Sequence, residues 1–250
     1  MFIIQVSTIN IDMNPFREAL KKFQYQKPMP VKTGLVYGNP TRYQVEVTTN
    51  PNDLYKSIIQ SGVAIKYYNM PYNAFLESSG DPVSRKELQY MIDLQSGLTE
   101  DDKSFILECE RHVEEVWVKE LDRIGIPKID KDKIKDFLCV TDGLLMSLKY
   151  HYQRPRPLQL AYTYSVPLYP FLATSANSPA YPSGHSFDAY KIAFLLAKRY
   201  PEKAMHLLEV AERITMSRVK GGVHYPSDSA LSKLMARELT DQGFFDKYLV

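Results

Sequence analysis

The sequence predicts a mainly α-helical protein, because helix caps and helical spacing of apolar residues dominate the chain after residue 96. In residues 105–121, apolar side chains recur every three or four positions, as they do on one buried helix face. The first 95 residues differ, since residues 43–49 (YQVEVTT) alternate in the manner of a β-strand. We therefore expect an all-α helical bundle core over residues 96–250 and a small irregular region with some β structure over residues 1–95.

Local signals suggest several elements in the N-terminal region. A β-branched run covers residues 2–11, and Gly and Pro residues in 34–40 are typical of a turn between strands. Asn14 and Pro15 suit the N-cap and first position of a short helix over residues 14–23. A second short helix is expected over residues 84–95. No signal assigns this region a role.

The core helices are expected in the following order. Thr99 can cap a helix over residues 99–124, with Asp102 completing a capping box. A helix over 131–150 should end at the Pro-rich segment QRPRP. Residues 152–182 form a long connection of the kind that often serves as a lid or binding loop. Further helices are expected over 186–199, 201–216 and 226–240.

Composition and charge exclude some classes of protein. The 250 residues are 44% hydrophobic and 24% charged, which is ordinary for a globular protein. The net charge of +2 argues against nucleic-acid binding, which usually needs a strong basic stripe. No apolar run is long enough to span a membrane, and the N-terminus lacks the basic segment of a signal peptide. We expect a soluble, cytoplasmic protein of undetermined oligomeric state.

The segment at residues 182–185 (PSGH) is suited to binding an anion. It leads directly into a predicted helix, whose first N–H groups have no partners inside the helix and lie at its positive end. Gly184 allows the backbone to approach a ligand closely, and Ser183 adds a hydroxyl group. His185 would lie beside the anion, where an imidazole can protonate a leaving group.

The segment at residues 217–228 (SRVKGGVHYPSD) places His224 and Asp228 four residues apart around a helix start. A carboxylate bound to one imidazole nitrogen leaves the other nitrogen free to act as nucleophile or base. Upstream, Arg218 offers a guanidinium for phosphate oxygens, and residues 149–157 add Lys149 and Arg156. These three cations suit a phosphoryl group, whose transfer concentrates negative charge on its oxygens.

Singly, each segment is weak evidence, because RPRP is commonly a polyproline stretch, PSGH a capping turn and H-x-x-x-D a surface pair. Together and in order, K-x₆-R-P, P-S-G-H and S-R-x₅-H-x₃-D resemble the signature of the type-2 phosphatidic acid phosphatase superfamily. That superfamily includes bacterial class A acid phosphatases, lipid phosphatases, glucose-6-phosphatase and vanadium-dependent haloperoxidases. The resemblance covers roughly residues 100–240 and implies an all-α bundle.

The resemblance implies a metal-independent phosphomonoester hydrolase that needs no cofactor. His224 would attack phosphorus to form a phosphohistidine, Asp228 would orient it, and His185 would protonate the leaving alcohol. The groups implied to bind phosphate oxygens are Lys149, Arg156, Ser183, Gly184 and Arg218.

Three further residues are candidate substrate contacts. Arg154 duplicates the Arg-Pro pattern and would flank the mouth of the site. Asp188 stands in a helix where the family leads us to expect a smaller residue, so it would alter substrate choice. Tyr181 belongs to the Tyr-rich connection, whose default role is packing and whose alternative role is an aromatic wall for an organic leaving group. The expected substrate is a small soluble phosphate ester, for example a nucleotide.

Two alternatives remain at this stage. A vanadium-dependent haloperoxidase would use the same residues to bind vanadate as a cofactor, with His224 as its axial ligand, whereas vanadate should inhibit a phosphatase. Chain length favours the phosphatase, because known haloperoxidases are generally longer. A non-catalytic phosphate-binding protein is the second alternative, and it is disfavoured because binding needs no general acid such as His185.

Overall fold

The computed structural model describes residues 57, 58, 61, 82–152, 154–169, 171, 176 and 178–249. The β elements expected over residues 2–11 and 43–49, the turn over 34–40 and the helix over 14–23 lie outside the described residues. No β-strand occurs in the described part of the chain, which is predominantly helical. The predicted mainly α fold is therefore confirmed for these residues.

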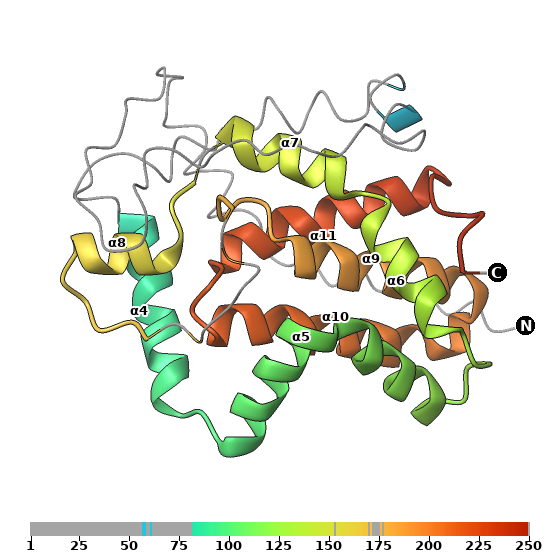
Figure 1. The fold of residues 1–250 in the computed structure, drawn as a ribbon, viewed down its shortest axis with the longest axis horizontal. Helices are drawn as coiled ribbons and strands as arrows, with labels where there is room; N and C mark the ends of the chain where they lie inside the picture. The colour runs from blue at the N-terminus through green and yellow to red at the C-terminus, as the bar shows by residue number, and fades with distance from the viewer. Residues whose placement is uncertain are drawn as a thin grey trace, which may run out of the picture.

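Figure 1 shows how the described helices are arranged in space. They are α4 (Pro82–Ser96), α5 (Glu100–Arg123), α6 (Lys131–Cys139), α7 (Asp142–Tyr152), α8 (Pro157–Thr163), α9 (Gly184–Arg199), the 3₁₀ helix η4 (Pro201–Lys203), α10 (Ala204–Lys220) and α11 (Pro226–Asp241). None of the helices within the described ranges is both long enough and apolar enough to cross a membrane.

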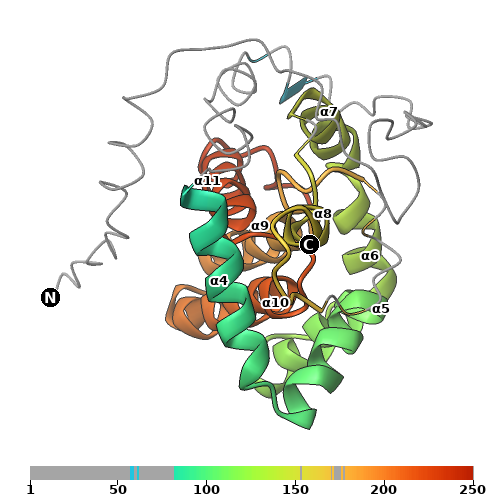
Figure 2. The same ribbon diagram turned by 90° about the vertical axis from the view of Figure 1, so that its left-hand side faces the viewer.

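Helix α9 forms the centre of the bundle. It packs against α10 and α11, and α5 packs on the outer side of α10 (Figure 2). Every residue of α9 from Phe187 to Leu196 except Asp188 is buried, so the helix is enclosed on nearly all sides. This arrangement explains why residues 186–199 show little amphipathic contrast. The N-terminal end of α9 points towards the loops that carry the sequence motifs.

Local capping signals predicted several helix starts. Thr99 and Asp102 form the predicted capping box, with Asp102 N donating to Thr99 Oγ1 at 3.1 Å and Thr99 N donating to Asp102 Oδ2 at 3.2 Å. Helix α11 begins at Pro226, as its fixed φ angle favours. Helix α9 begins at Gly184, two residues earlier than predicted, because Ser183 is its N-cap.

The single helix expected over residues 131–150 is wrong, since α6 ends at Cys139 and α7 begins at Asp142. The buried Lys191 of α9 explains the break. Its Nζ donates to the carbonyl oxygens of Phe137 at 2.8 Å and Leu138 at 3.1 Å, and to Thr141 Oγ1 at 2.9 Å. A cation that binds the last carbonyl groups of α6 stabilises the end of that helix.

The long connection expected over residues 152–182 contains the short helix α8, which begins at Pro157 immediately after the Pro-rich segment. This position suits proline, because the first residue of a helix needs no N–H partner. The connection therefore contains helical structure that the loop prediction did not include.

Candidate active site

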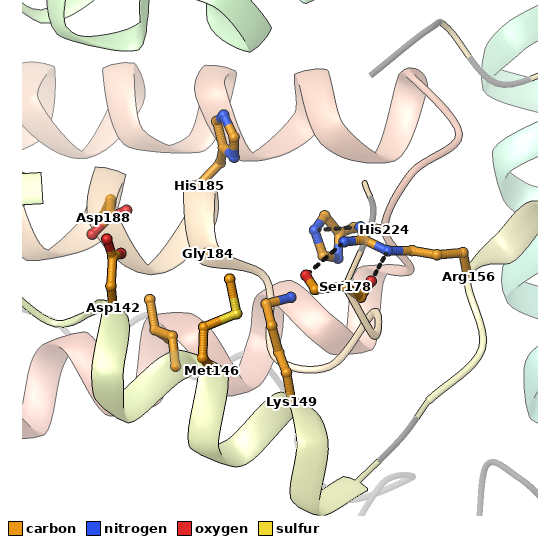
Figure 3. Close-up of a pocket in the computed structure, with 10 residues that line it drawn as sticks. Asp142, Met146, Lys149, Arg156, Ser178, Gly184, His185, Asp188 and His224 are labelled. Carbon is orange, nitrogen blue, oxygen red and sulfur yellow. Dashed lines mark hydrogen bonds between the residues drawn. The ribbon is translucent and has the colours of Figure 1, made fainter. Parts of the chain in front are cut away.

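A cavity of about 200 Å³ opens at the N-terminal end of α9, between that helix, α7 and the motif loops (Figure 3). Cationic side chains and His224 lie at one end, acidic side chains lie at the other, and His185 lies between them. The lining residues are Asp142, Leu145, Met146, Lys149, Arg156, Ser178, Gly184, His185, Asp188 and His224. All three sequence motifs thus contribute to one cavity.

The His224 imidazole is held in one orientation by partners on both ring nitrogens. Its Nδ1 lies 3.1 Å from Oδ2 of Asp228, and its Nε2 lies 2.9 Å from Nη1 of Arg156. A guanidinium can only donate, so Nε2 must accept and Nδ1 must carry the proton. This arrangement leaves the basic lone pair of Nε2 directed towards the cationic end of the cavity.

Asp228 is fully buried behind His224. Besides His224 Nδ1, its Oδ2 accepts a hydrogen bond from Tyr225 N at 2.9 Å, and its Oδ1 accepts one from Arg154 Nη1 at 2.5 Å. The expectation that Arg154 flanks the mouth of the site is therefore wrong. Its side chain is completely buried on the far side of Asp228 and does not line the cavity.

The Arg156 guanidinium is fixed before any ligand binds. Its Nε donates to the carbonyl oxygen of Ser178 at 2.8 Å, and its Nη1 donates to that of Val223 at 2.8 Å. Lys149 lies beside it, with Nζ donating to the carbonyl oxygen of Pro179 at 2.8 Å. Burial and the charge of Arg156 hold the pKa of Lys149 well below its usual value. Two basic side chains therefore converge where His224 Nε2 points.

Gly184 and His185, the first two residues of α9, line the cavity as the PSGH motif predicted. Ser183 is placed differently, because it is fully buried and outside the cavity lining. Its Oγ accepts hydrogen bonds from Ser186 N at 3.4 Å and from Ser186 Oγ at 2.9 Å. In this structure Ser183 caps α9 and orients the helix N-terminus towards the cavity.

Arg218 does not line the cavity itself. It is almost fully buried, and its Nη2 binds Oε2 of Glu110 on α5 at 2.6 Å. The two side chains are 2% and 5% exposed, so the ion pair is shielded from solvent. The charge of Arg218 nevertheless reaches both histidines, because it contributes to lowering the pKa of His185 and of His224.

The surroundings of both histidines favour the neutral form of the imidazole. Burial lowers the pKa of His224 well below its usual value, and the charges of Arg156 and Lys149 act in the same direction. Burial, followed by the charge of Arg218, likewise lowers the pKa of His185. A neutral imidazole beside several cations is a nucleophile in an environment that attracts anions.

The opposite end of the cavity is acidic. Asp188, one of the candidate substrate contacts, lines it, and its Oδ1 lies 2.7 Å from the buried Lys191 Nζ. Asp142, at the start of α7, lies beside it in Figure 3. Burial, reinforced by the charge of Asp188, raises the pKa of Asp142 to about 6. Met146 lies between the acidic and cationic ends.

Tyr181 is not brought to the cavity. Its ring is buried, with a T-shaped contact to Tyr152 at 5.1 Å between centroids, and it lies outside the cavity lining. The expected substrate contact is therefore a packing residue in this structure, which was the default role for the tyrosines of this segment.

Several residues near the site had no sequence signal. Ser178, Asp142 and Met146 line the cavity, and Glu110 binds Arg218. Each is an ordinary residue type outside the motifs, and only tertiary packing brings it to the site. Among the described residues, the group with metal-ligand geometry is His112, Glu114 and Glu115 on α5, none of which lines the cavity.

Comparison with known proteins agrees with the motifs. Residues 137–237 match the model of the PAP2 superfamily, and this segment contains Lys149, Arg156, His185, His224 and Asp228. A search of curated proteins found no match. Residues 137–237 are therefore similar to the PAP2 superfamily, the type-2 phosphatidic acid phosphatase superfamily, whose members are generally phosphatases.

Proposed function

We propose that this protein is a metal-independent phosphomonoester hydrolase that works through a phosphohistidine intermediate on His224. The observation that carries the proposal is the pair of contacts on His224. Asp228 holds the Nδ1 proton, and Arg156 binds Nε2 at the cationic end of the cavity. This geometry presents a basic nitrogen lone pair at the place where a phosphate group would bind.

In the first step, phosphate oxygens bind Arg156, Lys149 and the backbone amide at the start of α9. An oxygen takes the Arg156 donor that now binds Nε2, which frees the lone pair to attack phosphorus. The Nε2–P bond forms, the bond from phosphorus to the ester oxygen breaks, and His185 donates a proton to the departing alcohol. The imidazolium that forms on His224 is stabilised by the Asp228 carboxylate.

His185 must carry a proton for that step, although burial and, after it, the surrounding cations lower its pKa. A bound phosphate dianion offsets those cations, so substrate binding favours protonation of His185. In the second step, neutral His185 accepts a proton from water as the water oxygen attacks phosphorus and the P–Nε2 bond breaks. Inorganic phosphate and the starting protonation state result.

The charges of Lys149 and Arg156, with the helix N-terminus of α9, supply the electrostatic stabilisation that phosphoryl transfer needs. Arg218 reinforces it from behind the cavity wall. The proposed substrate is a small water-soluble phosphate ester, because the cavity is small and Asp188 offers hydrogen-bond acceptors at the end opposite the cations.

The proposal is tested by hydrolysis of p-nitrophenyl phosphate by the purified chain in EDTA, with and without vanadate. The native protein should release phosphate in EDTA, vanadate should inhibit competitively, and His224→Ala should abolish turnover. His206→Ala, which removes an exposed histidine of α10, is the matched control and should keep full activity.

Activity that EDTA removes would contradict metal independence, and activity retained in His224→Ala would contradict the nucleophile. If the chain hydrolyses no ester but brominates a halide acceptor when vanadate and peroxide are supplied, the haloperoxidase alternative replaces this proposal. The same cationic cavity suits vanadate, whose geometry resembles pentacoordinate phosphorus.

A further inference from the structure

Helix α4 lies outside the segment that matches the superfamily, yet it reaches the buried side of the candidate active site. Its Glu87 lies next to Arg154, which binds Asp228. At its C-terminal end, α4 is also fixed to α10, because Gln95 Nε2 donates to the carbonyl oxygen of Lys220 at 3.0 Å. Helix α4 is therefore joined to the core at Glu87 and again near its C-terminal end.

Arg154 joins the two carboxylates. Its Nη1 donates to Asp228 Oδ1 and, at 2.7 Å, to Ser227 Oγ, while its Nη2 donates to Glu87 Oε2 at 3.0 Å. The guanidinium also lies over the Tyr225 ring, 3.9 Å from its centroid. Arg154 and Asp228 are 0% exposed and Glu87 is 11% exposed, so the three charges interact with little screening by solvent.

Glu87 also binds the first turn of α11, the helix that carries Asp228. Its Oε1 accepts from Ser227 N at 2.8 Å, and its Oε2 accepts from Ser227 Oγ at 2.9 Å. The first N–H groups of a helix have no partners within the helix, and a carboxylate there is favourable. Glu87 thus holds both the guanidinium that binds Asp228 and the backbone next to Asp228.

We propose that Glu87 and Arg154 are positioning residues that fix the Asp228 carboxylate against His224 Nδ1, so that α4 forms part of the active site. This inference rests on the proposed function. Arg154 lies between the carboxyl groups of Glu87 and Asp228, and its charge, with the hydrogen bonds from Ser227, opposes the rise that burial gives to the pKa of Glu87. Without Glu87, the Arg154 guanidinium loses the hydrogen bond from Nη2 to Glu87 Oε2 and is less constrained in the geometry that binds Asp228 Oδ1.

The test is Glu87→Gln, which keeps size but replaces one acceptor oxygen with a donor that faces either Ser227 or Arg154. Because Glu87 acts through Asp228, kcat should fall about 10- to 100-fold, as for other residues that orient a catalytic ligand, while KM changes less than about threefold. Asp93→Asn, on the exposed face of the same helix, is the matched control and should leave both values unchanged.

A second readout does not depend on turnover. The downfield proton resonance of His224 Nδ1–H, identified by its loss in His224→Ala, reports the contact with Asp228. Glu87→Gln should shift this resonance upfield and speed its exchange with water, and Asp93→Asn should not. If Glu87→Gln fails to fold, Ser227→Ala removes only the hydroxyl that joins Glu87 to Arg154 and should show the same effects in smaller degree.

A folded Glu87→Gln variant with native kcat and an unchanged resonance would overturn the inference while leaving the phosphatase proposal intact. If the native chain hydrolyses no phosphate ester, the function fails, and the resonance still decides whether Glu87 positions the Asp228–His224 pair.

Discussion

Replacing Asp228 by asparagine tests how the structure prepares His224. The carboxylate accepts hydrogen bonds on both oxygens, with His224 Nδ1 and Tyr225 N on Oδ2 and Arg154 on Oδ1. Asparagine has only one acceptor oxygen, so its amide NH₂ must replace either Oδ2 or Oδ1. In either orientation of the Asp228→Asn side chain, the new amide NH₂ group faces another hydrogen-bond donor.

If the NH₂ group replaces Oδ2, His224 can keep the contact only by moving its proton to Nε2. That proton would then oppose Arg156 Nη1, which lies 2.9 Å away, and the lone pair that attacks phosphorus would be lost. The same substitution in a buried Asp–His pair of a hydrolase costs about ten-thousandfold in kcat. We expect a loss of about 10³- to 10⁴-fold here, which corresponds to about 4 to 5.5 kcal/mol of transition-state stabilisation.

If the NH₂ group replaces Oδ1 instead, it faces Arg154, which keeps Glu87 but loses its second buried carboxylate. Breaking a buried ion pair from one side costs about 3 to 5 kcal/mol. Asp228→Asn should therefore also lower the free energy of unfolding, because the carboxylate charge that faces Arg154 is lost in either orientation. Loss of activity with little loss of stability would identify the wrong tautomer as the cause.

The assay compares steady-state hydrolysis of p-nitrophenyl phosphate with urea unfolding for the native chain and the variant. Asp241→Asn, at the exposed end of the same helix, is the matched control, because its ion pair with Arg237 is more than half exposed. Its kcat should stay within about twofold of native. A folded Asp228→Asn variant with kcat within tenfold of native would refute the tautomer argument.

Three further outcomes concern stability. Folding lowers the pKa values of His185 and His224, so unfolding takes up protons when the pH falls below about 6.5. The thermal midpoint of unfolding should therefore fall between pH 7 and pH 5. It should fall less steeply in a variant in which both histidines are replaced by Asn. Asp142 has a folded pKa of about 6, above the reference 3.8, so its ionisation opposes folding at pH 7. Asp142→Asn should stabilise by about 1 kcal/mol at pH 7, after allowance for solvent screening, with the gain vanishing near pH 4 in urea titrations. Lys191→Met should cost about 3 to 5 kcal/mol by urea unfolding, whereas Lys198→Met, whose ion pair is exposed, should cost less than about 1 kcal/mol.

Much of the fold follows from short-range signals in the sequence. The Thr99 capping box and Pro226 at the start of α11 depend on side chains within a few residues of the backbone groups they affect. Such contacts form from local geometry, so a sequence pattern can predict them. The break between α6 and α7 depends instead on Lys191, more than fifty residues away along the chain, and no local pattern announces it.

At the candidate site too, some features follow from local sequence patterns and others depend on long-range packing. Of the side chains that the motifs suggested for phosphate binding and catalysis, Lys149, Arg156, His185 and His224 line the cavity, whereas Ser183 and Arg218 lie outside its lining. The spacing did not predict direction, because Arg154 and Arg156 differ by two residues yet point to opposite sides of the His224–Asp228 pair.

The roles of Glu87 and Glu110 could not be predicted either. Each is a glutamate on a helix that precedes the motifs, in a pattern that suits any solvent-facing helix. Their pairing with Arg154 and Arg218 arises when α4 and α5 pack against the core, and burial turns them into fixed partners of the two arginines. Long-range packing, rather than local propensity, decides such contacts.

The phosphohistidine mechanism requires a covalent phosphoryl group on His224, which rapid acid-free quenching with a radiolabelled phosphate ester can detect. The native chain should retain label that is stable in alkali and released by mild acid, as expected of a phosphoramidate, and peptide mapping should place it on His224. Label should be absent from His224→Ala and present in His206→Ala. Turnover by the native chain with no label on His224 at any quench time would contradict the account.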